Sequence, residues 1–173
     1  MTESLLAVKE LFEIRKLQDV IRPMVEPPAH LNTKWLKQNN WVAVPVESGS
    51  HFDDEDARLL AHAMESAGIH SCFALATEPL QNFPVCFEVK ATKEGLIAFS
   101  HECAHFNFIL ISESQSCAVL CTVYDYFLVS GMPEFVELAL GCTIVTSRER
   151  FLQFANDSDE SHRLAEVARR YEF

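Results

Sequence analysis

The chain has 173 residues, of which 49% are hydrophobic and 23% are charged, and it carries a formal net charge of −11. Its 13 phenylalanines set it apart from disordered chains, which are poor in aromatic side chains, so we expect one folded domain over residues 1–173. The negative charge argues against binding to nucleic-acid phosphates, and the longest apolar runs are too short to cross a bilayer, so no membrane association is expected.

The six cysteines include no Cys-x-x-Cys pair, and most lie in apolar, strand-like segments: Cys72, Cys86, Cys103, Cys117, Cys121 and Cys142. This pattern predicts buried, reduced thiols. The first residues, Met1 to Ser4, lack the basic and apolar regions of a secretory signal. We therefore expect a cytoplasmic location.

The first predicted element is a helix, because apolar residues recur at helical spacing over 5–21. Pro23 ends it, and the proline-rich residues 23–28 are typical of a stiff connector, so the chain begins with an N-terminal helix, 1–22, joined by this connector. A short helix over 32–38 follows. Residues 41–46 then predict a strand that contains Pro45, which favours an edge or a strand end.

Asp53 is a predicted N-cap for a helix that closes at Gly68. Strands are expected over 70–77 and 84–90, and Thr92 then caps a helix that reaches about His105.

A hairpin follows, with one strand over 106–111 and a return strand over 117–129. Pro133 lies in the first turn of the next helix, and Gly141 ends it. Thr146 to Glu149 match a capping box that opens another helix, and one more helix closes the chain.

The predicted order of elements is α-α-β-α-β-β-α-β-β-α-α-α. A doubly wound parallel sheet would show stricter alternation of strands and helices. The order favours an α+β fold with a mixed, mostly antiparallel sheet of about five strands and helices packed on one of its faces.

One motif predicts metal chemistry. His101-Glu102-Cys103-Ala104-His105 matches the pattern His-Glu-x-x-His. Histidines four residues apart on a helix can both bind zinc, and Glu102 would activate the bound water. The fragment resembles the zinc-dependent peptidases, and by analogy with the members that use a glutamate, Glu134 or Glu137 would be the third ligand. This resemblance implies a zinc hydrolase with His101 and His105 as metal ligands.

The alternative is that the same histidines lie on a solvated helix face. At 100° per residue, Leu96, Phe99 and Cys103 define the buried side of the helix, and His101 and His105 point away from it. No nucleophile elbow, P-loop or dinucleotide-binding glycine motif occurs in the chain.

The acidic residues Asp53-Asp54-Glu55-Asp56 predict a different kind of site. Four consecutive acids attract a basic protein and accelerate its association, so Asp54 and Glu55 are candidate partner-binding residues. The alternatives are that the run keeps the protein soluble, or that it stabilises the start of a helix through the macrodipole.

Tyr124 and Tyr126 alternate with Asp125 and Phe127 on the predicted return strand. Two tyrosines on one strand face could anchor a protein interface, and the alternative is cross-strand packing within the sheet.

Two hypotheses follow. The first is a non-enzymatic acidic protein-binding module, which would act on a basic partner as an inhibitor or immunity-like protein does and would need no cofactor. The second is a zinc-dependent hydrolase that uses His101, Glu102 and His105. Assembly into a homo-oligomer remains open in both.

Overall fold

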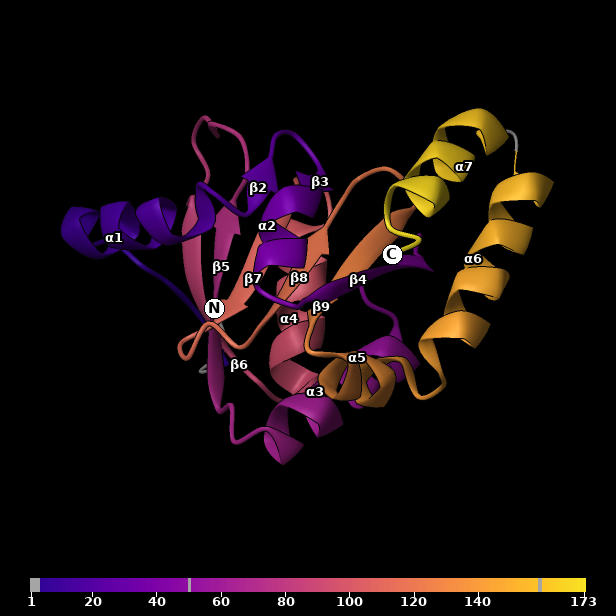
Figure 1. The fold of residues 1–173 in the computed structure, drawn as a ribbon. Helices are drawn as coiled ribbons and strands as arrows, with labels where there is room; N and C mark the ends of the chain where they lie inside the picture. The colour runs from indigo at the N-terminus through magenta and orange to yellow at the C-terminus, as the bar shows by residue number, and fades with distance from the viewer. Residues whose placement is uncertain (1–3, 50, 159) are drawn as a thin grey trace.

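The computed structural model describes residues 4–49, 51–158 and 160–173 (Figure 1). Seven helices are found in these ranges: α1 Leu11–Ile21, α2 Thr33–Gln38, α3 Asp54–Ser66, α4 Lys93–Cys103, α5 Pro133–Leu140, α6 Ile144–Asp157 and α7 Ser161–Arg170. Nine strands accompany them: β1 Leu5–Ala7, β2 Val25–Glu26, β3 His30–Leu31, β4 Val42–Glu47, β5 Ser71–Ala76, β6 Cys86–Lys90, β7 Phe108–Ser112, β8 Cys117–Cys121 and β9 Tyr126–Gly131.

Seven of the strands form one sheet in the order β1-β6-β5-β7-β8-β9-β4, and β2 and β3 form a separate two-stranded sheet. The predicted α+β class is confirmed. The expected count of about five strands was too low, and every strand pair within the described ranges is antiparallel, so the sheet is not mixed. β4, with its Pro45, is an edge strand, as predicted.

The predicted helix over 5–21 is wrong in its first part. Leu5 to Ala7 form β1, which pairs with β6 in the register Leu5↔Val89. Leu5 is buried and Leu6 is half exposed, the alternation of an edge strand with one covered face. The stiff connector predicted over 23–28 contains a short strand that was not predicted, because Val25 pairs with Leu31 in the small sheet.

The predicted return strand over 117–129 is two strands, β8 and β9. Between them Asp125 adopts a positive φ of 66°. The Thr122 hydroxyl donates to the carbonyl of Tyr126 (2.5 Å), and the amide of Val123 donates to the side chain of Asn107 (3.0 Å). These bonds satisfy the backbone of a tight turn and reverse the chain.

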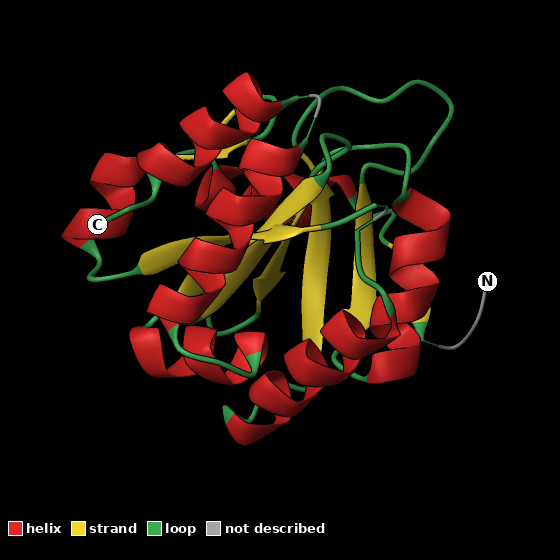
Figure 2. Ribbon diagram, turned by 90° about the vertical axis from the view of Figure 1, so that its right-hand side faces the viewer, coloured by secondary structure: helices red, strands yellow, loops and turns green. Residues whose placement is uncertain are grey.

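Helices cover both faces of the sheet, not one as expected (Figure 2). Helices α3, α4 and α5 pack on one face, and α1, α2, α6 and α7 pack on the other. The strands alternate between the two cores: in β9, Phe127 and Val129 belong to the α3–α5 side, and Tyr126 and Leu128 to the opposite side. Every residue of β7, β8 and β9 is buried, which explains why these strands are apolar throughout and show no polar alternation.

The helix boundaries follow local capping. Asp53 and Thr92 accept backbone hydrogen bonds as N-caps, Pro133 occupies the first turn of α5, and Gly141 ends it with φ of 64°. These four predictions are confirmed. Helix α6 starts earlier than predicted, because Thr143 and not Thr146 is its cap.

Candidate functional site: an acidic cleft at the β4 edge

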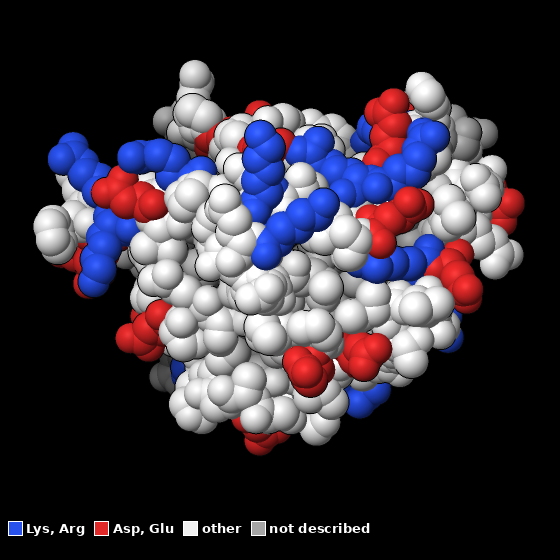
Figure 3. All heavy atoms as spheres, viewed as in Figure 1, with Lys and Arg blue, Asp and Glu red and all other residues white. Residues whose placement is uncertain are grey.

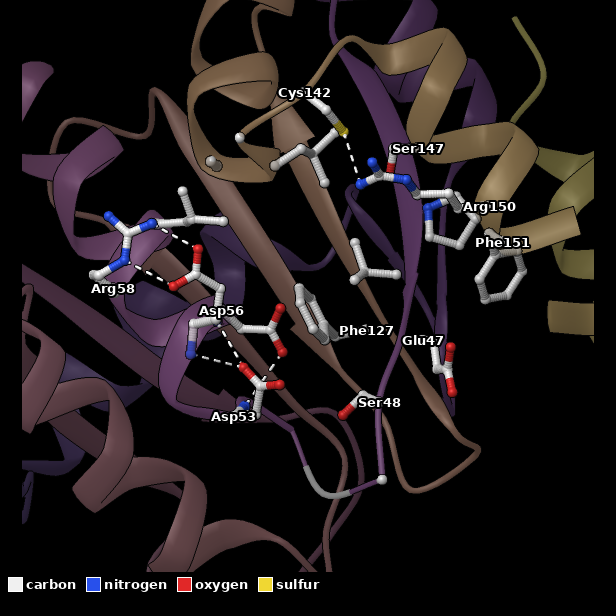
Figure 4. A pocket seen from close by; sticks show the side chains of 18 residues that line it. Glu47, Ser48, Asp53, Asp56, Arg58, Phe127, Cys142, Ser147, Arg150 and Phe151 are labelled. Atoms are coloured by element: carbon white, nitrogen blue, oxygen red, sulfur yellow. Dashed lines mark hydrogen bonds and ion pairs between the residues drawn. The ribbon is translucent and has the colours of Figure 1, made fainter. Parts of the chain in front are cut away.

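A cleft of about 760 Å³ opens at the β4 edge of the large sheet. Its walls are the end of β4, the first turns of α3 and the turn from α5 to α6, and Phe127 of β9 contributes an aromatic ring (Figure 4). The cleft lies where the chain crosses from the α3–α5 layer to the α6–α7 layer on the other face of the sheet. Its shape therefore depends on both layers.

Three carboxylates line the cleft and make no ion pair in the described part of the chain: Glu47, Asp53 and Asp56. Glu47 is the exposed last residue of β4. Asp53 and Asp56 come from the start of α3, where they form a capping box. The Asp53 carboxylate accepts from the amides of Glu55 (2.9 Å) and Asp56 (2.8 Å), and Asp56 accepts from the amide of Asp53 (3.2 Å).

The capping box holds Asp56 in an unfavourable electrostatic position. Burial raises the pKa of the Asp56 carboxyl to about 6, and the charges of Asp53 and Glu55 add to this shift, although the hydrogen bond from the Asp53 amide opposes it. A nearby cation would stabilise the ionised Asp56 carboxylate and so offset both the cost of its burial and the repulsion by its acidic neighbours. The site therefore favours a positively charged group.

Two arginines also line the cleft. Arg58 is already bound to Glu55 through two hydrogen bonds of 2.6 and 2.8 Å. The Arg150 guanidinium lies 3.8 Å from the sulfur of Cys142, the one described cysteine that is not fully buried. In Figure 4, Asp53 and Asp56 lie on one side of the Phe127 ring, and Cys142 and Arg150 lie on the other. The cleft therefore has an acidic wall and an opposite wall that carries a cation.

The two acids predicted to bind a partner, Asp54 and Glu55, each form an ion pair within the chain. Asp54 is bound to Lys93 of α4, and Glu55 to Arg58, although all four side chains remain solvent-exposed to some degree. Both acids are therefore ion-paired. The acids of the same run that form no ion pair in the described residues are Asp53 and Asp56, whose carboxylates accept the backbone hydrogen bonds of the capping box.

The zinc motif lies elsewhere, at the end of α4. His101 and Glu102 are exposed on the last turn, and His105 lies beyond the helix, which ends at Cys103. Ala104, the residue before His105, still has right-handed helical backbone angles, and His105 lies in the turn that follows. Within 4–49, 51–158 and 160–173, no three His, Cys, Asp or Glu side chains form a group that could hold a metal ion. Of the two suggested third ligands on α5, Glu137 accepts a hydrogen bond from the amide of Ile144 (3.2 Å).

The two predicted interface tyrosines do not share a strand face. Tyr124 lies in the β8–β9 turn, with its ring 5.1 Å from the Arg163 guanidinium. Tyr126 is 2% exposed, and its hydroxyl donates to the carbonyl of Ala29 (3.0 Å). Tyr126 is a core residue.

Charge is strongly segregated in the chain. Residues 42–141, which form β4 to β9 and α3 to α5, hold fourteen acidic residues and three basic ones, Arg58, Lys90 and Lys93. The segments 8–41 and 142–173 hold eleven basic and ten acidic residues. Figure 3 shows lysines and arginines gathered on the face that carries α1, α2 and α7. The net negative charge therefore belongs to the segment that forms the α3–α5 side.

The cleft combines residues that the sequence predicted with others that it did not. Asp53 and Asp56 belong to the acidic run, but nothing in the sequence linked them to Glu47, Phe127 or the α5–α6 turn. No helix in the described part of the chain has the length and apolar character needed to cross a membrane. Searches against models of protein families, curated proteins and solved structures gave no match to this chain.

Proposed function

We propose that the protein is a non-enzymatic protein-binding module that takes a basic segment of a protein partner into the cleft at the β4 edge. The observation that carries this proposal is the pairing of charge with shape: a cleft lined by Glu47, Asp53 and Asp56 opens at the α3–α5 layer, to which the segment with all of the net negative charge belongs. The field of that segment would attract a basic partner over a distance, and the cleft would give it a specific place to bind.

The cleft suits an arginine or lysine side chain. A guanidinium or ammonium group would pair with the carboxylates of Asp53 and Asp56, and its aliphatic part would pack on Leu59 and Leu140, which are only partly buried. Pairing would also lower the pKa of Asp56 from about 6 and remove the repulsion within the capping box. An inhibitor or immunity-like protein would use such a site against a basic partner.

The test compares two variants that lose the same charge. The cleft variant carries Glu47→Gln, Asp53→Asn and Asp56→Asn, and Asn at position 53 keeps a good N-cap. The control variant carries Glu13→Gln, Glu149→Gln and Asp157→Asn, three exposed acids of α1 and α6. Each is used to capture proteins from the lysate of the native host, and the association rate of the captured protein is measured at low and high salt.

We expect a basic partner that binds the wild-type chain and the control at similar rates. The cleft variant should bind it about tenfold or more weakly, because it lacks the charge pairs at the binding site. The association rate with wild type should fall steeply with salt. Equal binding by the cleft variant, or a captured partner without a basic surface, would contradict the proposal.

A further inference from the structure

Helix α1 carries an exposed apolar end. Leu11 is 69% exposed and Phe12 is 80% exposed, whereas only Ile14 and Ile21 of this helix are buried. In Figure 1 the helix extends from the body at the side opposite to α6. We propose that this end of α1 docks into the acidic cleft of a second copy of the chain. The inference rests on the proposed function, because it assigns a partner to the same cleft.

The exposed end combines two apolar side chains with two cations. Arg15 follows Leu11 by four residues and Lys16 follows Phe12 by four, so each pair shares one side of the helix. All four side chains are exposed, and they lie away from the side that buries Ile14. We call Leu11, Phe12, Arg15 and Lys16 the α1 tip.

The cations of the α1 tip have no acidic partner in the described part of the chain. Arg15 and Lys16 make no ion pair among residues 4–49, 51–158 and 160–173, whereas Asp19, the next acid on the same side of the helix, is bound to Arg22 at 2.7 Å. The tip therefore presents free positive charge beside exposed apolar surface. Such a surface fits an acidic site that also has an apolar floor.

The cleft offers these complementary features. Leu59 and Leu140, which are partly exposed, provide apolar surface, and Glu47, Asp53 and Asp56 provide carboxylates without a cation partner in the described residues. Phe12 would fill the apolar part, and Arg15 or Lys16 would pair with the carboxylates. A volume of about 760 Å³ is within the range of clefts that take a compact ligand of several side-chain groups.

The arrangement of the sheet makes this a contact between copies. Helix α1 follows β1, one edge of the seven-stranded sheet, and the cleft opens at β4, the other edge. The tip of one copy therefore cannot reach its own cleft. The contact joins two different surfaces, so copies would associate head to tail. Each copy carries a net charge of −11, so the contact depends on local complementarity of charge. Residues 8–41, which include the tip, hold six basic and four acidic residues, whereas residues 42–141, which include the carboxylates of the cleft, hold three basic and fourteen acidic ones.

Analytical ultracentrifugation of the whole chain at low and high salt tests the inference. The tip variant carries Phe12→Ser and Lys16→Gln. Its control carries Val145→Ser and Lys34→Gln, which removes a 65% exposed apolar side chain and an exposed lysine elsewhere. The cleft variant is the one described above. Melting curves establish that each variant is folded.

We expect wild type and control to associate at low salt and to dissociate at high salt. The tip variant and the cleft variant should each self-associate about tenfold or more weakly. A mixture of the two should associate again, because one still has an intact cleft and the other an intact tip. Only a contact between tip and cleft predicts this recovery.

Three results would overturn the inference: wild type that is monomeric at every concentration and salt, a tip variant that associates as wild type does, or no recovery in the mixture. Monomeric wild type that sediments with phosphatidylserine vesicles and loses this with the tip variant would assign the tip to membranes. A monomeric wild type whose cleft variant still loses the captured basic partner would leave the proposed function standing.

Discussion

At the scale of single residues, His51 gives the first prediction. It lies between β4 and α3, the two elements that supply Glu47, Asp53 and Asp56 to the cleft. The ring is 1% exposed and stacks on Phe99 at 5.6 Å, and its Nε2 lies 2.9 Å from the carbonyl oxygen of Cys103. Its Nδ1 has no hydrogen-bond partner among the residues that the structure describes. Burial lowers the pKa of His51, the carbonyls of Cys103, Thr122 and Phe106 oppose this shift, and the charge of His105 adds to it. His51 is therefore neutral in the folded protein at neutral pH.

The lowered pKa of His51 predicts that acid destabilises the fold. Below the unfolded-state value of 6.5, the unfolded chain binds a proton that the folded chain binds less readily, so stability falls as the pH decreases from 6.5 toward the lower folded-state pKa. His51→Asn, which tolerates the positive φ of 58° at this position, should remove this part of the loss. Urea unfolding of wild type and variant at pH 7.5 and 5.5 measures it as a difference.

The titration of Asp56 changes stability with pH in the direction opposite to that of His51. For this reason the pH dependence of wild type must be compared with that of His51→Asn. The pKa of Asp56 is raised from 3.8 to about 6, so the folded state binds the additional proton, and stability rises as the pH falls through 6. This contribution is present in both wild type and His51→Asn and cancels in the comparison. An unchanged pH dependence in the variant would show that His51 does not contribute.

At the element scale, the sequence predicted those features that depend on local chemistry. The caps at Asp53 and Thr92 and the limits of α5 need only neighbouring backbone groups, so their residue types identified them. The strand β1 could not be found in this way. A run of three apolar residues fits a helix as well as a strand, and its partner β6 lies about eighty residues later in the chain.

The turn at 122–125 and the cleft could not be predicted either, because both depend on contacts between segments that are separate in the sequence. Asn107 stabilises the turn from another segment, and the cleft is lined by the end of β4, the start of α3 and the turn between α5 and α6, which are separate in the sequence. The sequence did contain one sign of the second helical layer. The strands β7 and β8 are apolar throughout, and strands that lack polar alternation are typically buried on both faces of the sheet.

Gly95 of α4 gives a prediction about element packing. A Cβ at this position would lie 2.2 Å from the carbonyl oxygen of Lys90, which belongs to the backbone of β6 and cannot move aside easily. In an open helix, glycine to alanine is stabilising by about 1 kcal/mol. Here we expect Gly95→Ala to be destabilising, by about 1–3 kcal/mol, because α4 must shift away from the sheet.

Chemical denaturation measures this effect, with the exposed neighbour Glu94→Ala as the control. The control should cost less than about 1 kcal/mol, since it loses only a favourable charge near the helix start. A Gly95→Ala protein as stable as wild type would mean that α4 packs less tightly on β6 than the structure describes.

At the scale of the whole molecule, two cores share one sheet. Because the strands alternate between the cores, unfolding of either helical layer would expose one face of β7, β8 and β9 to water. The two layers should therefore unfold together, in keeping with the single domain over 1–173 expected from the sequence. The cysteines offer a way to measure this, since they occur in both cores.

Cys86 lies in the core beneath α1, α2, α6 and α7, and Cys121 lies in the core beneath α3, α4 and α5. Burial raises the pKa of Cys86 to about 12 and that of Cys121 well above its ordinary value, so neither thiol should react in the folded state. We expect Cys142 to react promptly with a thiol reagent, and Cys86 and Cys121 to react later at one common rate, that of global unfolding. Mass spectrometry of peptides after timed labelling gives each rate. If Cys86 reacted much faster than Cys121, the α1–α2–α6–α7 layer would open on its own, and the chain would not unfold as one cooperative domain.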